Sequence, residues 1–246
     1  MSVRYLLEAE NIGVRFGGVR ALDGVGLRLA PGEVCGLIGP NGAGKTTFFD
    51  VVSGIRRPDA GRVLLAGTDI TRRSPVWRAR HGMRRTFQRQ QLFGQLTVAD
   101  NLLVAQEWRR GGANTERSNG LLRDCGLDAL SDTYAGTLPV GRARMLELAR
   151  AAADRPRVLL LDEPASGMTA QERELLAATV RRLAGDGCAV LLVEHNVAFV
   201  MELCSRVVVL DLGSALAEGA PDVIRADTRV REAYLGTQPP AQSSHT

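Results

Sequence analysis

The sequence has few aromatic residues and no long apolar run. Phe, Trp and Tyr make up 4% of the 246 residues, whereas hydrophobic residues make up 45%. The core must therefore consist mainly of Leu, Val, Ile and Ala, as is common in α/β proteins with buried parallel strands. The longest apolar runs, such as residues 158–161, are far shorter than the roughly 20 residues that a membrane span needs. We therefore expect one substantial core and no membrane-spanning segment.

Cysteine is also scarce. The four cysteines, Cys35, Cys125, Cys188 and Cys204, have neither the spacing of a metal site nor that of a redox pair. We interpret them as small buried hydrophobic residues of a protein in a reducing compartment. Residues 1–10 contain two Glu and one Arg and no apolar run, so no secretory signal peptide is expected.

The charge balance is nearly even. The chain has 31 basic and 27 acidic residues, which gives a formal net charge of +4. Such an excess is typical of an ordinary solvated surface, and it is also compatible with nucleotide, nucleic-acid or anionic-membrane partners. Charge alone therefore selects no class of ligand.

The first part of the chain has the pattern of short strands separated by Gly and Pro turns. Strands are predicted at 6–12, 22–29, 34–38 and 61–67, and a helix at 45–53 after a glycine-rich loop. From about Gln88 to Pro156 strand-like runs are absent, and helices are predicted at 92–108, 120–130 and 141–153, with a loop at 111–115. This middle block is typical of a helical insert.

The last part of the chain alternates strands with helices again. Strands are predicted at 158–161, 190–193 and 207–210, and helices at 170–184 and 196–204. This order predicts βαβ units and a mainly parallel sheet. Residues 238–246, with two Pro and two Ser, are expected to form a disordered tail.

A phosphate-binding motif follows the strand at 34–38. Residues 39–46 read Gly-Pro-Asn-Gly-Ala-Gly-Lys-Thr, which fits the P-loop pattern of two glycines followed by lysine and a hydroxyl residue. Glycine lets backbone N–H groups converge on phosphate oxygens, and the start of the next helix adds partial positive charge. In such a loop Lys45 reaches the β- and γ-phosphates and Thr46 holds Mg²⁺.

Two carboxylates follow an apolar strand. Residues 158–161 are followed directly by Asp162 and Glu163. The carboxyl end of a buried strand opens on the crevice where α/β sheets bind ligands. Asp162 is suited to coordinate Mg²⁺, directly or from the second coordination sphere, and Glu163 to polarise an attacking water.

Taken together, these motifs resemble those of ABC-transporter ATPases, and the resemblance covers about residues 4–236. Four further segments match that family. Thr86-Phe87-Gln88 resembles its Q-loop, Ser166-Gly167-Met168-Thr169 lies at the D-loop position, Val193-Glu194-His195 resembles the switch-histidine segment, and Phe16 lies where an aromatic residue stacks on adenine.

The resemblance implies a complete ATP site and a fold. The implied ATP contacts are Phe16, Gly39, Asn41, Gly42, Ala43, Gly44, Lys45, Thr46 and Thr47. The implied Mg²⁺ ligands are Thr46, Gln88 and Asp162, and the implied catalytic residues are Glu163 and His195, with His195 contacting the γ-phosphate. The implied fold is α/β: a P-loop NTPase core with an N-terminal antiparallel β-subdomain and an inserted helical subdomain at about 89–156, all within a single domain at 1–237.

A closer likeness is to the ATPases of branched-chain amino-acid importers, a pattern that urea and amide importers share. It is carried by residues 85–88, 92–93, 96–98, 101–105 and 231–236. It implies an ATP-hydrolysing subunit that powers import of branched-chain amino acids or a related small polar solute. The implied location is the cytoplasmic face of the membrane. The implied partners are transmembrane permease subunits, a second ATPase subunit and, indirectly, an extracytoplasmic solute-binding protein, with no nucleic acid.

One motif departs from the family. Residues 138–142 read Leu-Pro-Val-Gly-Arg where most members have Leu-Ser-Gly-Gly-Gln, the signature that covers the γ-phosphate on the opposite subunit. Pro139 has neither an N–H nor a hydroxyl group, Val140 adds bulk, and Arg142 remains as a source of charge. Thr169 also replaces the common Asp of the D-loop. These changes predict a weak signature and a hetero-partner whose own signature is intact.

Two alternative functions stay open at this point. The first is an ABC ATPase associated with nucleic acid, although such proteins usually have two cassettes or a long coiled coil, and this chain has neither. The second is a non-hydrolysing regulatory ABC subunit, which the altered signature suggests.

Overall fold

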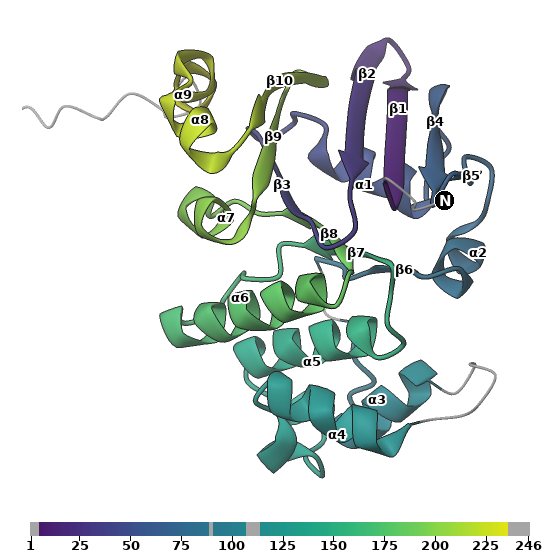
Figure 1. Ribbon diagram of the computed structural model, residues 1–246, viewed down its shortest axis with the longest axis vertical. Coiled ribbons are helices and arrows are strands. Elements are labelled where there is room, and N and C mark those ends of the chain that lie inside the picture. The colour runs from purple at the N-terminus through teal and green to yellow at the C-terminus, as the bar shows by residue number, and fades with distance from the viewer. Residues whose placement is uncertain (1–4, 89–90, 107–113, 236–246) are drawn as a thin grey trace, which may run out of the picture.

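The computed structural model describes residues 5–88, 91–106 and 114–235, which form two sheets and a set of helices (Figure 1). The first sheet is antiparallel, has the strand order β2-β1-β4-β5, and is made of β1 (Leu7–Phe16), β2 (Val19–Leu29), β4 (Ala60–Leu65) and β5 (Thr68–Asp69). It confirms the predicted antiparallel β-subdomain: β1 and β2 are longer than the apolar runs indicated, whereas the strand predicted at 61–67 ends at Leu65.

The second sheet has the strand order β10-β9-β3-β8-β7-β6. Its strands are β3 (Val34–Ile38), β6 (Met83–Arg85), β7 (Val158–Asp162), β8 (Ala189–Val193), β9 (Arg206–Asp211) and β10 (Ser214–Gly219). All neighbours are parallel except β9 and β10, which form a hairpin. The predicted α/β fold with a mainly parallel sheet is therefore confirmed.

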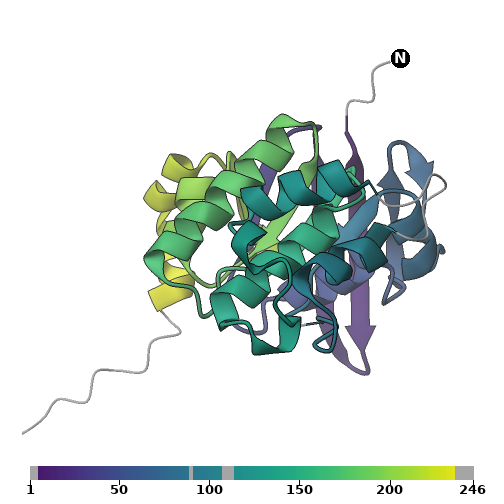
Figure 2. The ribbon, with the colours of Figure 1, turned by 90° about the horizontal axis from the view of Figure 1, so that it is seen from below.

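The helices lie on both faces of this second sheet (Figures 1 and 2). They are α1 (Lys45–Ser53), α2 (Pro75–Arg80), α3 (Val98–Gln106), α4 (Thr115–Asp124), α5 (Val140–Ala152), α6 (Ala170–Gly185), α7 (Val197–Leu203), α8 (Pro221–Ala226) and α9 (Thr228–Leu235), with 3₁₀ turns η1 (Asp128–Leu130) and η2 (Ala135–Thr137). Between β6 and β7 the described chain contains α3, α4 and α5 but no strand, as expected of an inserted helical block.

Alternate residues of the central strands supply two separate cores. In β7, Val158 and Leu160 pack with α1 and the antiparallel sheet, whereas Leu159 and Leu161 pack with α5, α6 and α7. This alternation follows from the two-residue period of a strand. It explains why β3, β7 and β8 are buried at every position, because both faces of the sheet are covered.

The helix expected at 92–108 begins later than predicted. Thr97 acts as its N-cap, since the Thr97 hydroxyl accepts a hydrogen bond of 3.1 Å from the backbone N–H of Asp100. Helix α3 therefore starts at Val98, and residues 92–97 form a loop with a turn at 94–95. Residues 107–108 lie outside the described residues, as do residues 111–113 of the expected loop.

The helix expected at 120–130 was also misplaced. Asn114 caps α4 by accepting a hydrogen bond of 2.8 Å from Arg117, so the helix starts at Thr115. It ends at Asp124 because Gly126 adopts φ 64°, and a short 3₁₀ turn follows. The sequence patterns did not predict α2, β5, β6, β10, α8 or α9. The tail at 238–246 and the end of the domain at 237 lie outside the described residues and stay predictions.

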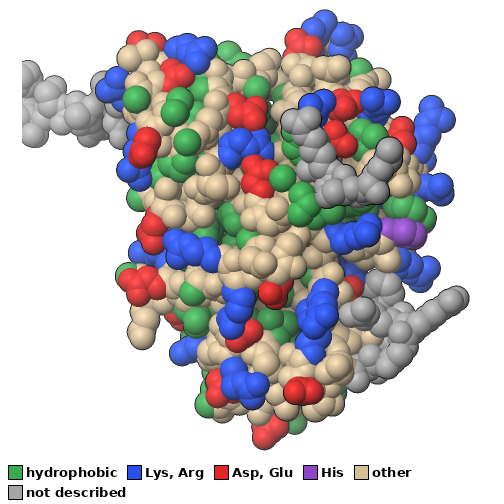
Figure 3. All heavy atoms as spheres, in the orientation of Figure 1, with side chains coloured by type: hydrophobic (Ala, Val, Ile, Leu, Met, Phe, Trp, Pro, Cys, Tyr) green, Lys and Arg blue, Asp and Glu red, His purple; other side chains and the backbone are tan. Residues whose placement is uncertain are grey.

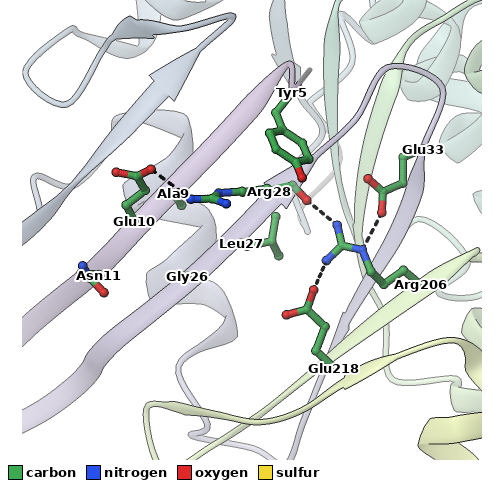
Figure 4. Close-up of a pocket in the computed structure, with 10 residues that line it drawn as sticks. All are labelled: Tyr5, Ala9, Glu10, Asn11, Gly26, Leu27, Arg28, Glu33, Arg206 and Glu218. Atoms are coloured by element: carbon green, nitrogen blue, oxygen red, sulfur yellow. Dashed lines mark hydrogen bonds and ion pairs between the residues drawn. The ribbon is translucent and has the colours of Figure 1, made fainter. Parts of the chain in front are cut away.

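A polar joint connects the two sheets at the end of β3 opposite the phosphate loop (Figure 4). The Arg206 guanidinium on β9 donates to Glu33, to Glu218 on β10 and to the Arg28 carbonyl oxygen on β2. These contacts line a groove of about 810 Å³ whose charged side chains are largely paired with one another. These paired charges indicate that the groove has a structural role, which is to connect the two sheets.

The four cysteines are buried and free, as expected. Burial raises the pKa of the Cys35, Cys125 and Cys188 thiols to about 12, which keeps them protonated at neutral pH. None of the helices in the described part of the chain has the length and apolar character needed to cross a bilayer.

A buried arginine closes the end of α1. Arg78 on α2 is 1% exposed, and its guanidinium donates to five backbone carbonyl groups, including Val51 and Val52 in the last turn of α1 and Ile70. No carboxylate among the described residues forms an ion pair with it, and burial lowers its pKa to about 10. The carbonyl groups at the end of α1 favour a cation there.

Arg78→Met should lower the free energy of unfolding by about 3 kcal/mol, because several buried carbonyl groups lose their donor. Urea denaturation monitored by circular dichroism measures the loss. Arg80→Met, an exposed arginine on the same helix, is the matched control and should change stability by no more than about 0.5 kcal/mol. Equal losses from the two substitutions would contradict this role of Arg78.

Candidate active site

The phosphate-binding loop lies where β3 ends and α1 begins. Gly39 and Gly44 have φ 154° and 104°. A Cβ atom on Gly39 would lie 2.1 Å from the Leu210 carbonyl oxygen, and one on Gly44 would lie 2.6 Å from the Ala21 carbonyl oxygen. The loop is therefore enclosed between β9 and β2, and only glycine fits at these two positions. Asn41 and Gly42 are exposed at its tip, and Thr47 is half-buried in α1.

Lys45 is the only lysine in the sequence, and it lies inside this loop. Its ammonium group donates hydrogen bonds of 2.6 Å to the Gly39 carbonyl oxygen and 2.8 Å to the Pro40 carbonyl oxygen. Burial lowers the pKa of Lys45, and the nearby Glu163 carboxylate raises it. The side chain is thus held in place before any phosphate arrives.

Three predicted residues from different strands meet at the carboxyl edge of the sheet. The Glu163 carboxylate, which follows β7, lies 2.8 Å from His195 Nε2, and His195 follows β8. Gln88, just beyond β6, donates a hydrogen bond of 3.3 Å to the other Glu163 oxygen. The backbone of Glu163 has φ 48°, a conformation unusual for a residue with a side chain. Glu163 is therefore the centre of the cluster that the sequence predicted.

Glu194 is a contributor whose role the sequence did not reveal. It is 5% exposed, and its carboxylate accepts hydrogen bonds from the backbone N–H groups of Ala165 (2.7 Å) and His195 (3.1 Å). Burial raises the pKa of Glu194, and these N–H groups lower it. Glu194 thus joins the loop after Glu163 to the loop that carries His195.

Arg85 is a second contributor that the sequence marked only as part of a family likeness. Its guanidinium forms an ion pair with Asp162 at 2.9 Å and with Asp50 on α1 at 2.6 Å. Burial raises the pKa of Asp162, and Arg85 lowers it. The predicted Mg²⁺ ligand Asp162 is therefore held by a cation from the adjacent strand.

The residues present fit a triphosphate and Mg²⁺. Around the exposed Gly42 a Cβ atom would meet nothing within 4 Å, so the tip of the loop is open to a ligand. The candidate metal ligands Thr46, Gln88 and Asp162 supply the hard oxygen atoms that Mg²⁺ prefers. Thr46 is exposed in the first turn of α1, where partial positive charge favours phosphate.

Phe16 lies at the end of β1 and is 46% exposed, with the Arg56 guanidinium 3.9 Å from its ring centroid. Its strand partner β2 passes the phosphate loop at Ala21. The ring is thus presented to solvent near the loop, and its stacking on adenine stays a prediction.

The altered signature segment packs against its own chain. Pro139 is the N-cap of α5 without a side-chain hydrogen bond, and the Arg142 guanidinium donates to the Gly126 carbonyl oxygen at 2.7 Å. Gly141 packs against Glu172: a Cβ atom there would lie 2.2 Å from the Glu172 carboxylate, which would have to shift to admit a larger residue. Thr169 caps α6 in a capping box with Glu172, which gives the Thr at this D-loop position a structural role.

Because Lys45 is the only lysine, an amine-reactive reagent followed by peptide mass spectrometry reports on it alone among side chains. We expect MgATP to reduce acylation of the peptide that contains Lys45 severalfold, since the triphosphate covers the loop. Labelling of the same peptide in the unfolded chain provides the normalisation. Equal labelling of the folded chain with and without MgATP would show that no phosphate reaches Lys45.

Comparisons with known proteins agree with this geometry. A family model described as ABC transporter matches residues 22–166, and one described as branched-chain amino acid ATP-binding cassette transporter matches residues 216–239. The high-affinity branched-chain amino acid transport ATP-binding proteins BraF of Pseudomonas aeruginosa and LivG of Escherichia coli K12 are 38% and 36% identical, over 95% and 94% of this chain and 98% of each relative. The lipopolysaccharide export system ATP-binding protein LptB of Acidithiobacillus ferridurans is 38% identical over 95% of this chain and 98% of the relative.

Solved structures give the same result. The ADP conformation of an ATP-binding cassette of an ABC transporter superposes with a TM-score of 0.85 at 31% identity, covering 94% of this chain and 99% of that one. A nucleotide-free ATP-binding cassette superposes with a TM-score of 0.82 at 30% identity, covering 94% and 98%. The chain therefore belongs to the ABC transporter family, as an ATP-binding cassette subunit of the kind whose ATPase activity powers transport.

Proposed function

We propose that this chain is the ATP-hydrolysing subunit of an importer for branched-chain amino acids or a related small polar solute. The observation that carries the proposal is the match of residues 216–239 to the C-terminal model of branched-chain amino acid cassettes. Its described residues, 216–235, comprise the end of β10, α8 and the whole of α9, and Tyr234 in α9 lies close to Gly39 of the phosphate loop. The likeness to LptB makes lipopolysaccharide export the second candidate.

In the proposed reaction water attacks the γ-phosphate in line. Lys45 and the N–H groups of the loop bind the phosphates, and His195 holds the γ-phosphate. Glu163 polarises the water and receives its proton. Thr46, Gln88 and Asp162 would hold Mg²⁺, which would supply positive charge to offset that of the phosphates. Glu163 contacts both His195, which follows β8, and Gln88, which follows β6. Loss of the γ-phosphate can therefore alter contacts next to both strands.

We place the permease contact beside Gln88, which gives the chain its place at the cytoplasmic face of the membrane. Two apolar side chains there are exposed, Ile55 at 51% and Phe87 at 41%, and both line a cavity of about 230 Å³. Apolar side chains left in water next to a catalytic loop are typical of a protein interface. The solute-binding protein would act from the other side, through the permease.

The face seen in Figure 3 does not favour a nucleic-acid partner. Acidic and basic side chains are interspersed over it, and several arginines lie around β4 and β5. Binding of this chain to DNA or RNA, with the steep salt dependence of phosphate contacts, would favour the rival function.

We further propose that the partner cassette is a different subunit with an intact signature. In a head-to-tail pair each nucleotide is bound by one P-loop and covered by the opposite signature. Pro139 and Val140 offer no hydroxyl and one N–H fewer than Ser-Gly would, so a homodimer would have two poorly covered sites. A hetero-pair would have one good site, which contains Lys45, Glu163 and His195 of this chain.

Glu163→Gln should leave ATP affinity unchanged and lower the hydrolysis rate by about 10²-fold or more, because the amide cannot accept the proton. Phosphate release measures the rate. In vesicles that contain the cognate permease, ATP-driven leucine uptake should stop with this variant. Glu202→Gln, an exposed site, is the control. ATP hydrolysis in step with export of a lipid, and no uptake of leucine, would support the second candidate instead.

The isolated chain should hydrolyse ATP slowly, and Pro139→Ser combined with Val140→Gly should raise its rate, because the restored donors reach the γ-phosphate. In the native pair, Glu163→Gln should remove most of the activity, whereas the matching change in the partner should remove less. Full activity from the isolated chain, or equal losses from the two changes, would contradict the asymmetric pair.

A further inference from the structure

Arg85 lies between the two elements that carry the candidate Mg²⁺ ligands. Thr46 is in the first turn of α1, and Asp162 is the last residue of β7. Arg85 is the last residue of β6, the strand that pairs with β7 and leads directly to Gln88. A single side chain therefore joins α1 to the end of β7, and it lies on the strand that leads to Gln88.

The two arms of its guanidinium contact different elements. Nη1 donates to Asp50 Oδ1 at 2.6 Å and to Ser53 Oγ at 2.9 Å, both on α1. Nη2 donates to Asp162 Oδ2 at 2.9 Å. Within the part of the chain that the structure describes, Asp162 Oδ1 accepts no hydrogen bond from a side chain. The fork thus occupies one carboxylate oxygen and leaves the other for a further ligand.

Packing fixes the direction of the fork. The side chains of Arg85 and Asp162 are each 9% exposed. The guanidinium carbon lies 5.6 Å from the Phe49 ring centroid and 5.1 Å from that of Phe87, and Nε is buried without a hydrogen-bond partner among the described residues. A buried N–H group without a partner is unfavourable. The contacts of Arg85 with the two carboxylates must therefore outweigh that loss.

We propose that Arg85 is a positioning residue of the Mg²⁺ site, which holds Asp162 Oδ2 and sets the distance between α1 and β7. This inference rests on the Mg²⁺-dependent ATP site proposed above. A lysine could not replace it, since one ammonium group lacks the planar fork that reaches Asp50 and Asp162 together. Partners that orient a metal ligand typically contribute about 10–100-fold to metal affinity.

The neighbouring arginine provides a matched control. Arg84 is on the same strand, is also poorly exposed, and forms an ion pair with Asp154 at the end of the helical block. Its removal costs a charge and a partly buried ion pair from the same strand, and the partner in that pair, Asp154, is not one of the candidate Mg²⁺ ligands. Comparison of the Arg84 and Arg85 variants therefore separates a general loss of stability from a change in Mg²⁺ affinity.

The test is equilibrium binding of the non-hydrolysable analogue AMP-PNP to the full chain, in EDTA and over a range of free Mg²⁺. Arg85→Lys should raise the Mg²⁺ concentration at half-maximal tightening by about tenfold or more, with affinity in EDTA unchanged within about twofold. Arg85→Met should behave alike, and Arg84→Met should match the parent. In an Asp162→Asn background, Arg85→Lys should have no further effect on the Mg²⁺ dependence, since the group that it positions is gone.

Three results would overturn the proposal. The Mg²⁺ dependence of Arg85→Lys could match that of the parent, AMP-PNP affinity in EDTA could fall as much as affinity in Mg²⁺, or Arg84→Met could shift the Mg²⁺ dependence equally. If Mg²⁺ did not raise the AMP-PNP affinity of the parent chain, the proposed Mg²⁺-dependent ATP site would be wrong. This inference, which rests on that site, would then be wrong as well. Affinity in EDTA also reports that each variant is folded.

Discussion

Buried negative charge at one edge of the parallel sheet is the constraint around which this site is built. Asp162 and Glu194 are nearly inaccessible, and the Glu163 carboxylate is near enough to both to raise the pKa of each. Each carboxylate is tolerated because donors reach it: Arg85 for Asp162, backbone N–H groups for Glu194, and His195 with Gln88 for Glu163. The strands that deliver these donors cannot move independently without leaving a charge uncompensated.

The helical block is tied to the same edge through its own charged residues. Arg144 on α5 donates to the Gln88 carbonyl oxygen at 2.7 Å, and Glu147 on α5 accepts from the Gln91 N–H at 2.7 Å. Glu147 is buried, and an ion pair of 3.0 Å joins it to Arg144. The segment around Gln88 is therefore anchored on α5 at one end and on Glu163 at the other. Helix α5, which begins at the altered signature, is thus connected through Gln88 to the candidate catalytic carboxylate of Glu163.

The sequence predicted the site better than it predicted the helical block. The P-loop, the strand before Asp162 and the His195 segment were recognisable because glycine, buried apolar runs and acids occur in a fixed order along the chain. The start of α3 at Val98 was missed because a single Thr97 cap outweighs the apolar residues before it. The bridging role of Arg85 could not be predicted, since Asp50 and Asp162 are distant in sequence and only the fold brings both to one guanidinium.

The burial of the four cysteines has a practical consequence for labelling the protein with thiol reagents. Their thiols are inaccessible in the folded chain, and those of Cys35, Cys125 and Cys188 have a pKa of about 12. A thiol-reactive spectroscopic label therefore meets an almost inert background. Single cysteines introduced at exposed positions, such as one on α5 and one on β4, could carry a donor and an acceptor dye without removal of any native cysteine. Any change in the distance between the helical block and the antiparallel sheet could then be followed in real time, in the otherwise unmodified protein.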